Sequence, residues 1–110
     1  MRNPVLLISA FAFIALVSSG NVQAHAGDHR ALAELDAIIK KSPAEPALLV
    51  ARGALYSRSG QWDKAERDLR LAETLGNKED VAFEFGRLYY RRGDNQKALG
   101  YIDTYIGAYP

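Results

Sequence analysis

From residue 30 onwards, apolar side chains recur at steps of three and four residues, which is the spacing of one face of an α-helix. Glycine and proline interrupt this pattern at short intervals, as they do between helices. The pattern therefore predicts five helices: Arg30 to Lys41, Ala47 to Ser59 with Pro46 in its first turn, one from Gly60 or Gln61 that closes at Gly76, one from Asn77 or Lys78 that ends before Gly93, and Asn95 to about Ala108.

Each predicted helix has recognisable ends and one apolar face. Asp28 and Asp94 are expected to cap the first and fifth helices, and Gly60 is expected to end the second. Gly76 is expected to close the third helix in the left-handed conformation. The side chains expected on the buried faces are Leu32, Leu35, Ile38, Ile39, Trp62, Ala65, Leu69, Ala72, Ala82, Phe85, Tyr89, Ala98, Ile102 and Tyr105.

The chain repeats a short frame of small and aromatic residues. The frame recurs after 33 residues, as the pairs Gly53 and Gly86, Tyr56 and Tyr89, Gly60 and Gly93, and Ala65 and Ala98. A fixed period of this length is typical of stacked helical units. We expect the glycines and alanines inside the helices to let neighbouring backbones approach closely.

This frame resembles the tetratricopeptide repeat, a pair of antiparallel helices. The matching positions are Leu49, Arg52, Gly53, Tyr56, Ala65 and Leu69 in the first copy, and Ala82, Phe85, Gly86, Tyr89, Ala98, Ile102 and Pro110 in the second. A half copy precedes them, with Ala31, Leu35, Ile38 and Pro43 at the spacing of the second helix. The resemblance implies an all-α, right-handed stack of antiparallel helix pairs, with a half repeat over residues 30–45 and full repeats over 46–78 and 79–110.

Two positions depart from the pattern of the family. Arg52 stands where the family prefers leucine, and Ala82 stands where it prefers a bulky residue. The packing of the first helix of each repeat is therefore the least predictable part of the fold.

In the tetratricopeptide superhelix, the first helix of each pair lines a concave groove. The resemblance places eight side chains in it: Val50, Ala54, Ser57, Arg58, Phe83, Arg87, Tyr90 and Arg91. An apolar patch edged with guanidinium groups suits an extended or carboxylate-bearing peptide. The carboxylate-clamp subfamily has Lys and Asn where this chain has Val50 and Ala54, so that clamp is not predicted. The alternative is that these side chains form only a solvated helix face with ordinary packing.

The last helix carries more apolar residues than one neighbouring helix can cover. These residues span too wide an arc of the helix for all of them to face the preceding helix. They include Tyr101, Ile102, Tyr105, Ile106 and Tyr109. We expect Tyr101, Tyr105 and Tyr109 to form an interface with a second copy or with another protein, since exposed apolar surface weakens a small domain. The alternative is that the tyrosine hydroxyls make this face tolerably wet.

The amino-terminal end has the layout of a secretory signal peptide. Met1 and Arg2 precede an apolar run from Val5 to Val17, which is shorter than the roughly 20 residues of a membrane-spanning helix. We expect residues 1–24 to be removed after Ala24, with Ala26 as a second register, and residues 25–29 to form a flexible linker. The mature protein is then periplasmic or secreted and has no stable membrane span.

Composition narrows the class of function. The chain has 14 basic and 13 acidic residues and no cysteine, and cleavage removes Arg2, which leaves a formal charge of zero. Such a surface does not suit nucleic-acid binding. No carboxylate spacing or glycine-rich loop indicates catalysis, and no cofactor is expected. The sequence thus favours a non-enzymatic scaffold or adaptor that binds a protein or peptide partner.

A copper-binding function is the alternative. Cleavage after Ala24 makes His25 the first residue, and its amine and ring nitrogen can chelate copper, with His29 or Asp28 as an extra ligand. This resembles the amino-terminal histidine of some periplasmic copper proteins. A solvated linker ahead of the first helix is the simpler interpretation of the same residues.

Overall fold

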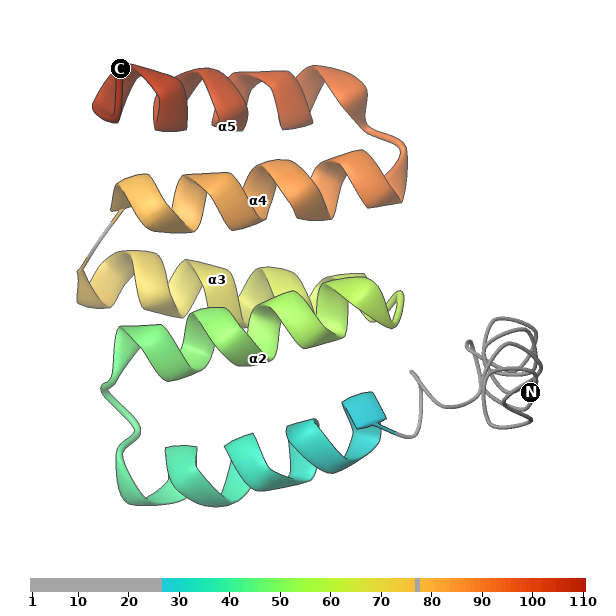
Figure 1. The fold of residues 1–110 in the computed structure, drawn as a ribbon, viewed down its shortest axis with the longest axis vertical. Helices are drawn as coiled ribbons and strands as arrows, with labels where there is room; N and C mark the ends of the chain where they lie inside the picture. Colours follow the sequence, from blue (N-terminus) through green and yellow to red (C-terminus); the bar gives the residue numbers. More distant parts are fainter. Residues whose placement is uncertain (1–26, 77) are drawn as a thin grey trace, which may run out of the picture.

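The computed structural model describes residues 27–76 and 78–110, and these residues form a stack of helices. A helix over residues 27–41 is followed by α2 (Pro46–Arg58), α3 (Trp62–Leu75), α4 (Lys78–Arg92) and α5 (Asn95–Ala108). Consecutive helices run in opposite directions, from the helix over residues 27–41 at one end to α5 at the other (Figure 1). The described residues contain no strand, so the predicted all-α stack is confirmed.

The helix ends follow local sequence in most places. Pro46 occupies the first turn of α2, where its missing N–H costs no hydrogen bond. Gly60 and Gly93 have φ angles of 79° and 91°, a region in which a side chain would be strained. Asp94 caps α5 by accepting a hydrogen bond of 3.1 Å from the backbone N–H of Lys97, as predicted.

Three expectations about the helix ends were wrong. Gly76 has φ 164° and ψ −140°, which is extended backbone and not the left-handed conformation. Asp28 does not cap the first helix, because residues 27–29 are already helical, and its carboxylate pairs with Arg58 of α2. Residues 27–29 are therefore not linker. His25 and residues 1–24, with the predicted signal peptide, lie outside the described residues.

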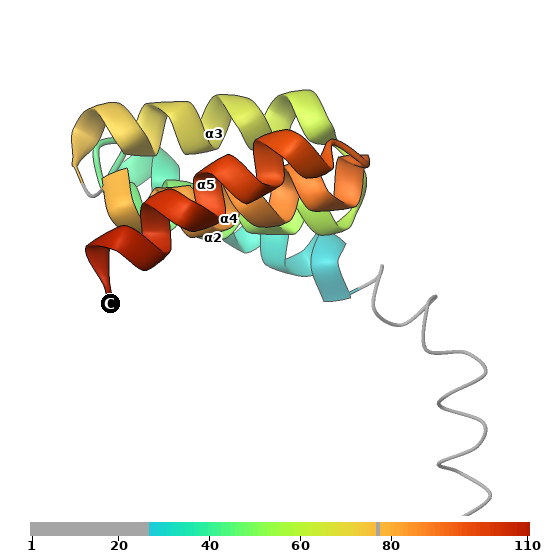
Figure 2. The same cartoon turned by 90° about the horizontal axis from the view of Figure 1, so that it is seen from above.

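The core lies between successive helices. The largest fully buried side chains are Leu49, Ser57, Leu69, Val81, Phe85 and Leu88. Seen from above, α2 and α4 overlap while α3 lies to one side of them (Figure 2), and α4 contacts both α2 and α3. The predicted burial is confirmed for six residues of α3 and α4, which are Ala65, Leu69, Ala72, Ala82, Phe85 and Tyr89. Ile38 was expected to be buried but is exposed, because its helix is covered on one face only and Ile39 takes that place.

The two repeats use the same close contacts. A Cβ added at Gly53 would lie 3.0 Å from Cγ of Leu69, and one added at Gly86 would lie 2.5 Å from Cδ1 of Ile102. Each added Cβ would also lie 3.4 Å from a carbonyl oxygen, that of Ala65 for Gly53 and that of Ala98 for Gly86. The glycines therefore permit the helices of each pair to approach, as the repeated frame predicts. None of the helices in the described part of the chain combines the length and the hydropathy needed to span a bilayer.

Candidate peptide-binding surface

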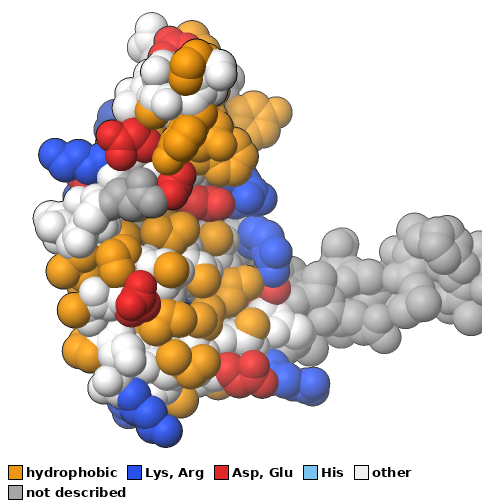
Figure 3. Space-filling view, turned by 60° about the vertical axis from the view of Figure 1, so that its left-hand side comes forward, with side chains coloured by type: hydrophobic (Ala, Val, Ile, Leu, Met, Phe, Trp, Pro, Cys, Tyr) orange, Lys and Arg blue, Asp and Glu red, His pale blue; other side chains and the backbone are white. Residues whose placement is uncertain are grey.

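The first helices of the two full repeats, α2 and α4, contact each other and share one exposed surface. Figure 3 shows hydrophobic side chains gathered across the middle of the molecule, with Lys and Arg on its right-hand side, at its foot and at its upper left. Of the predicted groove residues, Val50 and Ala54 are partly buried, Phe83 is 38% exposed, and Tyr90 is 71% exposed. The remaining four are Ser57, Arg58, Arg87 and Arg91.

Arg91 is the most constrained cation on this surface. Its Nη1 donates a hydrogen bond of 2.9 Å to Oγ of Ser57, which is only 1% exposed. Burial and the positive charge of Arg87 lower the pKa of Arg91, Glu84 opposes this shift, and Arg58 adds to it. Among the described residues no carboxylate lies within ion-pair distance of Arg91. Arg91 is therefore a partly buried cation without a paired carboxylate, close to two other guanidinium groups.

The two neighbouring arginines do have acidic partners. Arg58 pairs with Asp28, and Nη1 of Arg87 lies 3.3 Å from Oε1 of Glu84. Both arginines are exposed, so these pairs contribute little to stability and can exchange with a ligand. The Arg87 guanidinium also lies over the Phe83 ring, 5.8 Å from its centroid. This surface thus combines an exposed aromatic ring with three guanidinium groups.

The tyrosines of α5 lie against α4. Tyr101 stacks on Phe85 with ring centroids 4.8 Å apart, and Tyr105 lies 5.0 Å from Phe83. The hydroxyl of Tyr109 donates a hydrogen bond of 2.9 Å to Asp80. The large apolar side chains that α5 exposes most are instead Leu99 and Ile106. Helical spacing from Leu99 to Ile106 could have indicated this second face in the sequence.

A polar cavity of about 550 Å³ lies between the helix over residues 27–41, α2 and α3. This cavity was not predicted from the sequence, although Arg52, which departs from the repeat frame, forms part of its wall. Its other charged lining side chains are Asp36, Lys40, Lys64, Arg67 and Asp68.

His29 is exposed on the first helix, and the described part of the chain holds no group of three His, Cys, Asp or Glu able to bind a metal ion.

The chain is similar to the TPR repeat-containing protein YpiA of Bacillus subtilis (strain 168), with 32% identity over 78 residues. This similarity covers 70% of the chain, which spans only 18% of the length of that protein. No family model matches the chain. No solved structure matches it either.

Proposed function

We propose that this chain is a non-catalytic protein-interaction module of the tetratricopeptide type, and that its α2 and α4 surface binds a peptide through a carboxylate. The repeated frame, the helical stack and the similarity to a repeat-containing protein support the class. The observation that carries the ligand chemistry is the partly buried Arg91, which has an acceptor in Ser57 and no acidic partner among the described residues.

The chemistry of the guanidinium group explains why a carboxylate is the expected ligand group. Arginine has five N–H donors in a planar fork, and Arg91 uses Nη1 to reach Ser57. The remaining donors can bind both oxygens of one carboxylate. Phe83 and Tyr90 offer exposed aromatic surface beside it for an apolar side chain of the same peptide.

Two matched peptides test this function. One ends in a free carboxylate after two apolar residues, and the other is identical but ends in an amide. We expect the acid to bind the full chain about tenfold more tightly than the amide, because charge-assisted hydrogen bonds contribute roughly 1.5–3 kcal/mol. Isothermal titration calorimetry measures both affinities. Equal binding of the two peptides would contradict the proposal.

Variants of the chain then localise the carboxylate. Arg91→Gln should abolish the preference for the acid, whereas Arg67→Gln, in the polar cavity between the first helix, α2 and α3, should leave it intact. Ser57→Ala should reduce the preference without abolishing it, because Arg91 keeps its charge but loses the acceptor that orients it. A preference that survives Arg91→Gln would place the carboxylate elsewhere.

We also propose that the module works outside the cytoplasm, in the periplasm or as a secreted protein, after removal of residues 1–24. The short apolar run with its single preceding arginine supports this. Mass spectrometry of the protein from an exported fraction should find a terminus at His25 or at Gly27. A terminus at Met1 in that fraction would contradict cleavage.

A further inference from the structure

One face of α5 resembles a face of the first helix at equivalent positions. Equivalent positions are 67 residues apart, which is two repeat lengths. The equivalent pairs are Asp28 and Asn95, Leu32 and Leu99, Leu35 and Ile102, Asp36 and Asp103, and Ile39 and Ile106. Three of the five pairs are identical residues, and a fourth, Leu35 and Ile102, exchanges one branched apolar residue for another.

On the first helix this face is covered by α2. Leu32 and Ile39 are each 8% exposed. Oδ1 of Asp36 accepts a hydrogen bond of 3.0 Å from Nη1 of Arg52, and Asp28 pairs with Arg58. A helix with two arginines, α2, therefore lies against this face and pairs with its acidic residues.

On α5 the same face is uncovered. Leu99 is 62% exposed and Ile106 is 55% exposed. Asp103 lies between them in the helical register, is exposed, and forms no ion pair with any described residue. The residues that match a buried interface at one end of the stack are thus exposed at the other.

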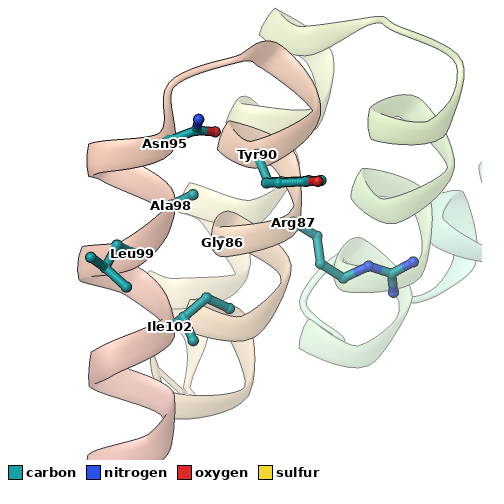
Figure 4. A pocket seen from close by; sticks show the side chains of 7 residues that line it. All are labelled: Gly86, Arg87, Tyr90, Asn95, Ala98, Leu99 and Ile102. Atoms are coloured by element: carbon teal, nitrogen blue, oxygen red, sulfur yellow. The ribbon is translucent and has the colours of Figure 1, made fainter.

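Beside this face, α4 and α5 form a groove of about 460 Å³. Its lining surface is mostly apolar, with Leu99 and Ile102 projecting from α5 and Tyr90 and Arg87 from α4 (Figure 4). The corresponding groove one repeat earlier, between α2 and α3, is occupied by α4. There the hydroxyl of Tyr89 donates to Glu66 at 2.6 Å, and Arg91 donates to Ser57. Grooves of this kind therefore accept a helix within this protein.

The residue at the position equivalent to Asp103 indicates which residue the covering helix carries opposite it. Asp36 at this position pairs with Arg52 of the covering helix. One repeat later, Arg70 of α3 stands at the position of Asp36, and Phe85 of α4 stands at the position of Arg52. The guanidinium of Arg70 lies 5.2 Å from the ring centroid of Phe85. An aspartate at this position thus accompanies an arginine opposite it, and an arginine accompanies an aromatic ring.

We propose that the groove between α4 and α5 binds a helix of a partner protein that resembles α2. This helix has a leucine at the place of Leu49 and, three residues later, an arginine that pairs with Asp103. Asp103 disfavours a helix with a carboxylate at that place. This groove shares Arg87 and Tyr90 with the α2 and α4 surface, but Leu99 and Asp103 belong to α5 alone, so variants of Asp103 test this proposal separately from the carboxylate site at Arg91.

A peptide of the α2 sequence, residues 46–58, is the direct probe. A free helix of this length is marginal in water, so the exposed positions are used for a lactam bridge, Ala47→Lys joined to Ala51→Asp. The peptide is titrated into the full chain while the methyl NMR signals of Leu99, Ile102 and Ile106 are recorded. We expect saturable shifts of these three residues.

A charge exchange then tests the contact with Asp103. The Arg52→Glu peptide should bind the natural chain at least tenfold more weakly than the Arg52 peptide. Asp103→Lys in the chain should weaken binding of the Arg52 peptide by a similar factor and restore binding of the Arg52→Glu peptide. Asp63→Lys, an equal charge change at another exposed position, should alter neither affinity. Circular dichroism verifies that each variant is helical.

Three results would overturn the proposal. The first is equal affinity for the Arg52 and Arg52→Glu peptides. The second is a shift of the Ile39 methyl signals in place of those of Leu99 and Ile106, because the peptide then replaces α2 on the first helix. The third is a free chain that sediments as a dimer with Leu99 and Ile106 protected, because a second copy then covers the face.

Discussion

Arg52 binds the carboxylate of Asp68 through two hydrogen bonds, from Nε at 2.7 Å and from Nη2 at 2.8 Å. These bonds raise the pKa of Arg52 well above its ordinary value, against the opposing effect of burial. One repeat later the same two positions are Phe85 and Tyr101, whose ring centroids lie 4.8 Å apart. An ion pair in one repeat therefore occupies the place of an aromatic stack in the next.

Loss of one partner of the ion pair should destabilise the fold strongly. Arg52→Leu leaves the buried carboxylate of Asp68 without its counter-charge, and we expect a loss of about 3 kcal/mol in the free energy of unfolding. Urea denaturation measures it. Arg87→Leu, which removes an exposed ion pair, should cost less than about 1 kcal/mol.

Exchange of both partners should restore stability. The double variant Arg52→Phe, Asp68→Tyr installs the pair found in the second repeat, and we expect it to recover all but about 1.5 kcal/mol of the single-variant loss. This recovery would mean that the side-chain pair of the second repeat can replace the pair of the first. A double variant as unstable as Arg52→Leu would show that the two interiors are not equivalent.

The two repeat glycines should respond differently to alanine. At Gly53 the new Cβ would meet Cγ of the fully buried Leu69, which has no room to move, so we expect a net loss of about 1 kcal/mol. At Gly86 the two nearest atoms are Cδ1 and Cγ1 of Ile102, at 2.5 and 2.8 Å, and this side chain is partly exposed and can rotate away. Gly86→Ala should therefore lie within about 0.5 kcal/mol of the natural chain, helped by the better helix propensity of alanine.

Gly100→Ala is the control for that comparison. No atom lies within 4 Å of the added Cβ, so only the helix propensity changes. We expect a gain of about 0.5–1 kcal/mol, measured by thermal or urea unfolding. The glycine interpretation of the repeat fails if Gly53→Ala is the most stable of the three variants.

Tyr89 should make stability depend on pH in the alkaline range. Burial, followed by the hydrogen bond to Glu66, raises the pKa of Tyr89 to about 12. The neutral phenol is thus favoured in the folded state, and its contribution is complete below the unfolded pKa of about 10 and is lost between about pH 10 and 12. Stability should fall less steeply across this window in Tyr89→Phe, as measured by urea denaturation at several pH values.

Glu66→Gln separates the two causes of that shift. The variant removes the negative charge that accepts from Tyr89 but leaves the ring buried. We expect the pKa of Tyr89, followed through the ultraviolet absorbance of tyrosinate, to fall from about 12 while staying above 10. An unchanged pKa in Glu66→Gln would assign the whole shift to burial.

The tyrosines on the outer part of the stack should differ in their effect on stability. Tyr101 stacks on Phe85 and Tyr89, so Tyr101→Ala should cost about 3 kcal/mol through lost packing. The exposed Tyr90 offers the matched comparison, and Tyr90→Ala should change stability by less than about 0.5 kcal/mol. Equal losses would mean that the ring of Tyr101 contributes no more than an exposed one.

Much of the helical stack was predictable from the chain alone. The three and four residue spacing of apolar side chains predicted the helices to within a few residues, because that spacing is a property of a single helix. Gly60 and Gly93 were predictable as helix ends, since a left-handed residue is a local requirement. The repeated frame further predicted that Gly53 and Gly86 mark close approaches between helices.

The pairing of side chains between helices was decided only by the tertiary structure. Arg52 lies 16 residues from both Asp36 and Asp68, and its bonds to both depend on the register of three helices. The same register buries Ile39 and leaves Ile38 exposed. Periodicity specifies which side of a helix is apolar, whereas the position of the next helix decides how much of that side is covered. The first helix and α5 carry matching faces, and only the packing of α2 makes one of them buried.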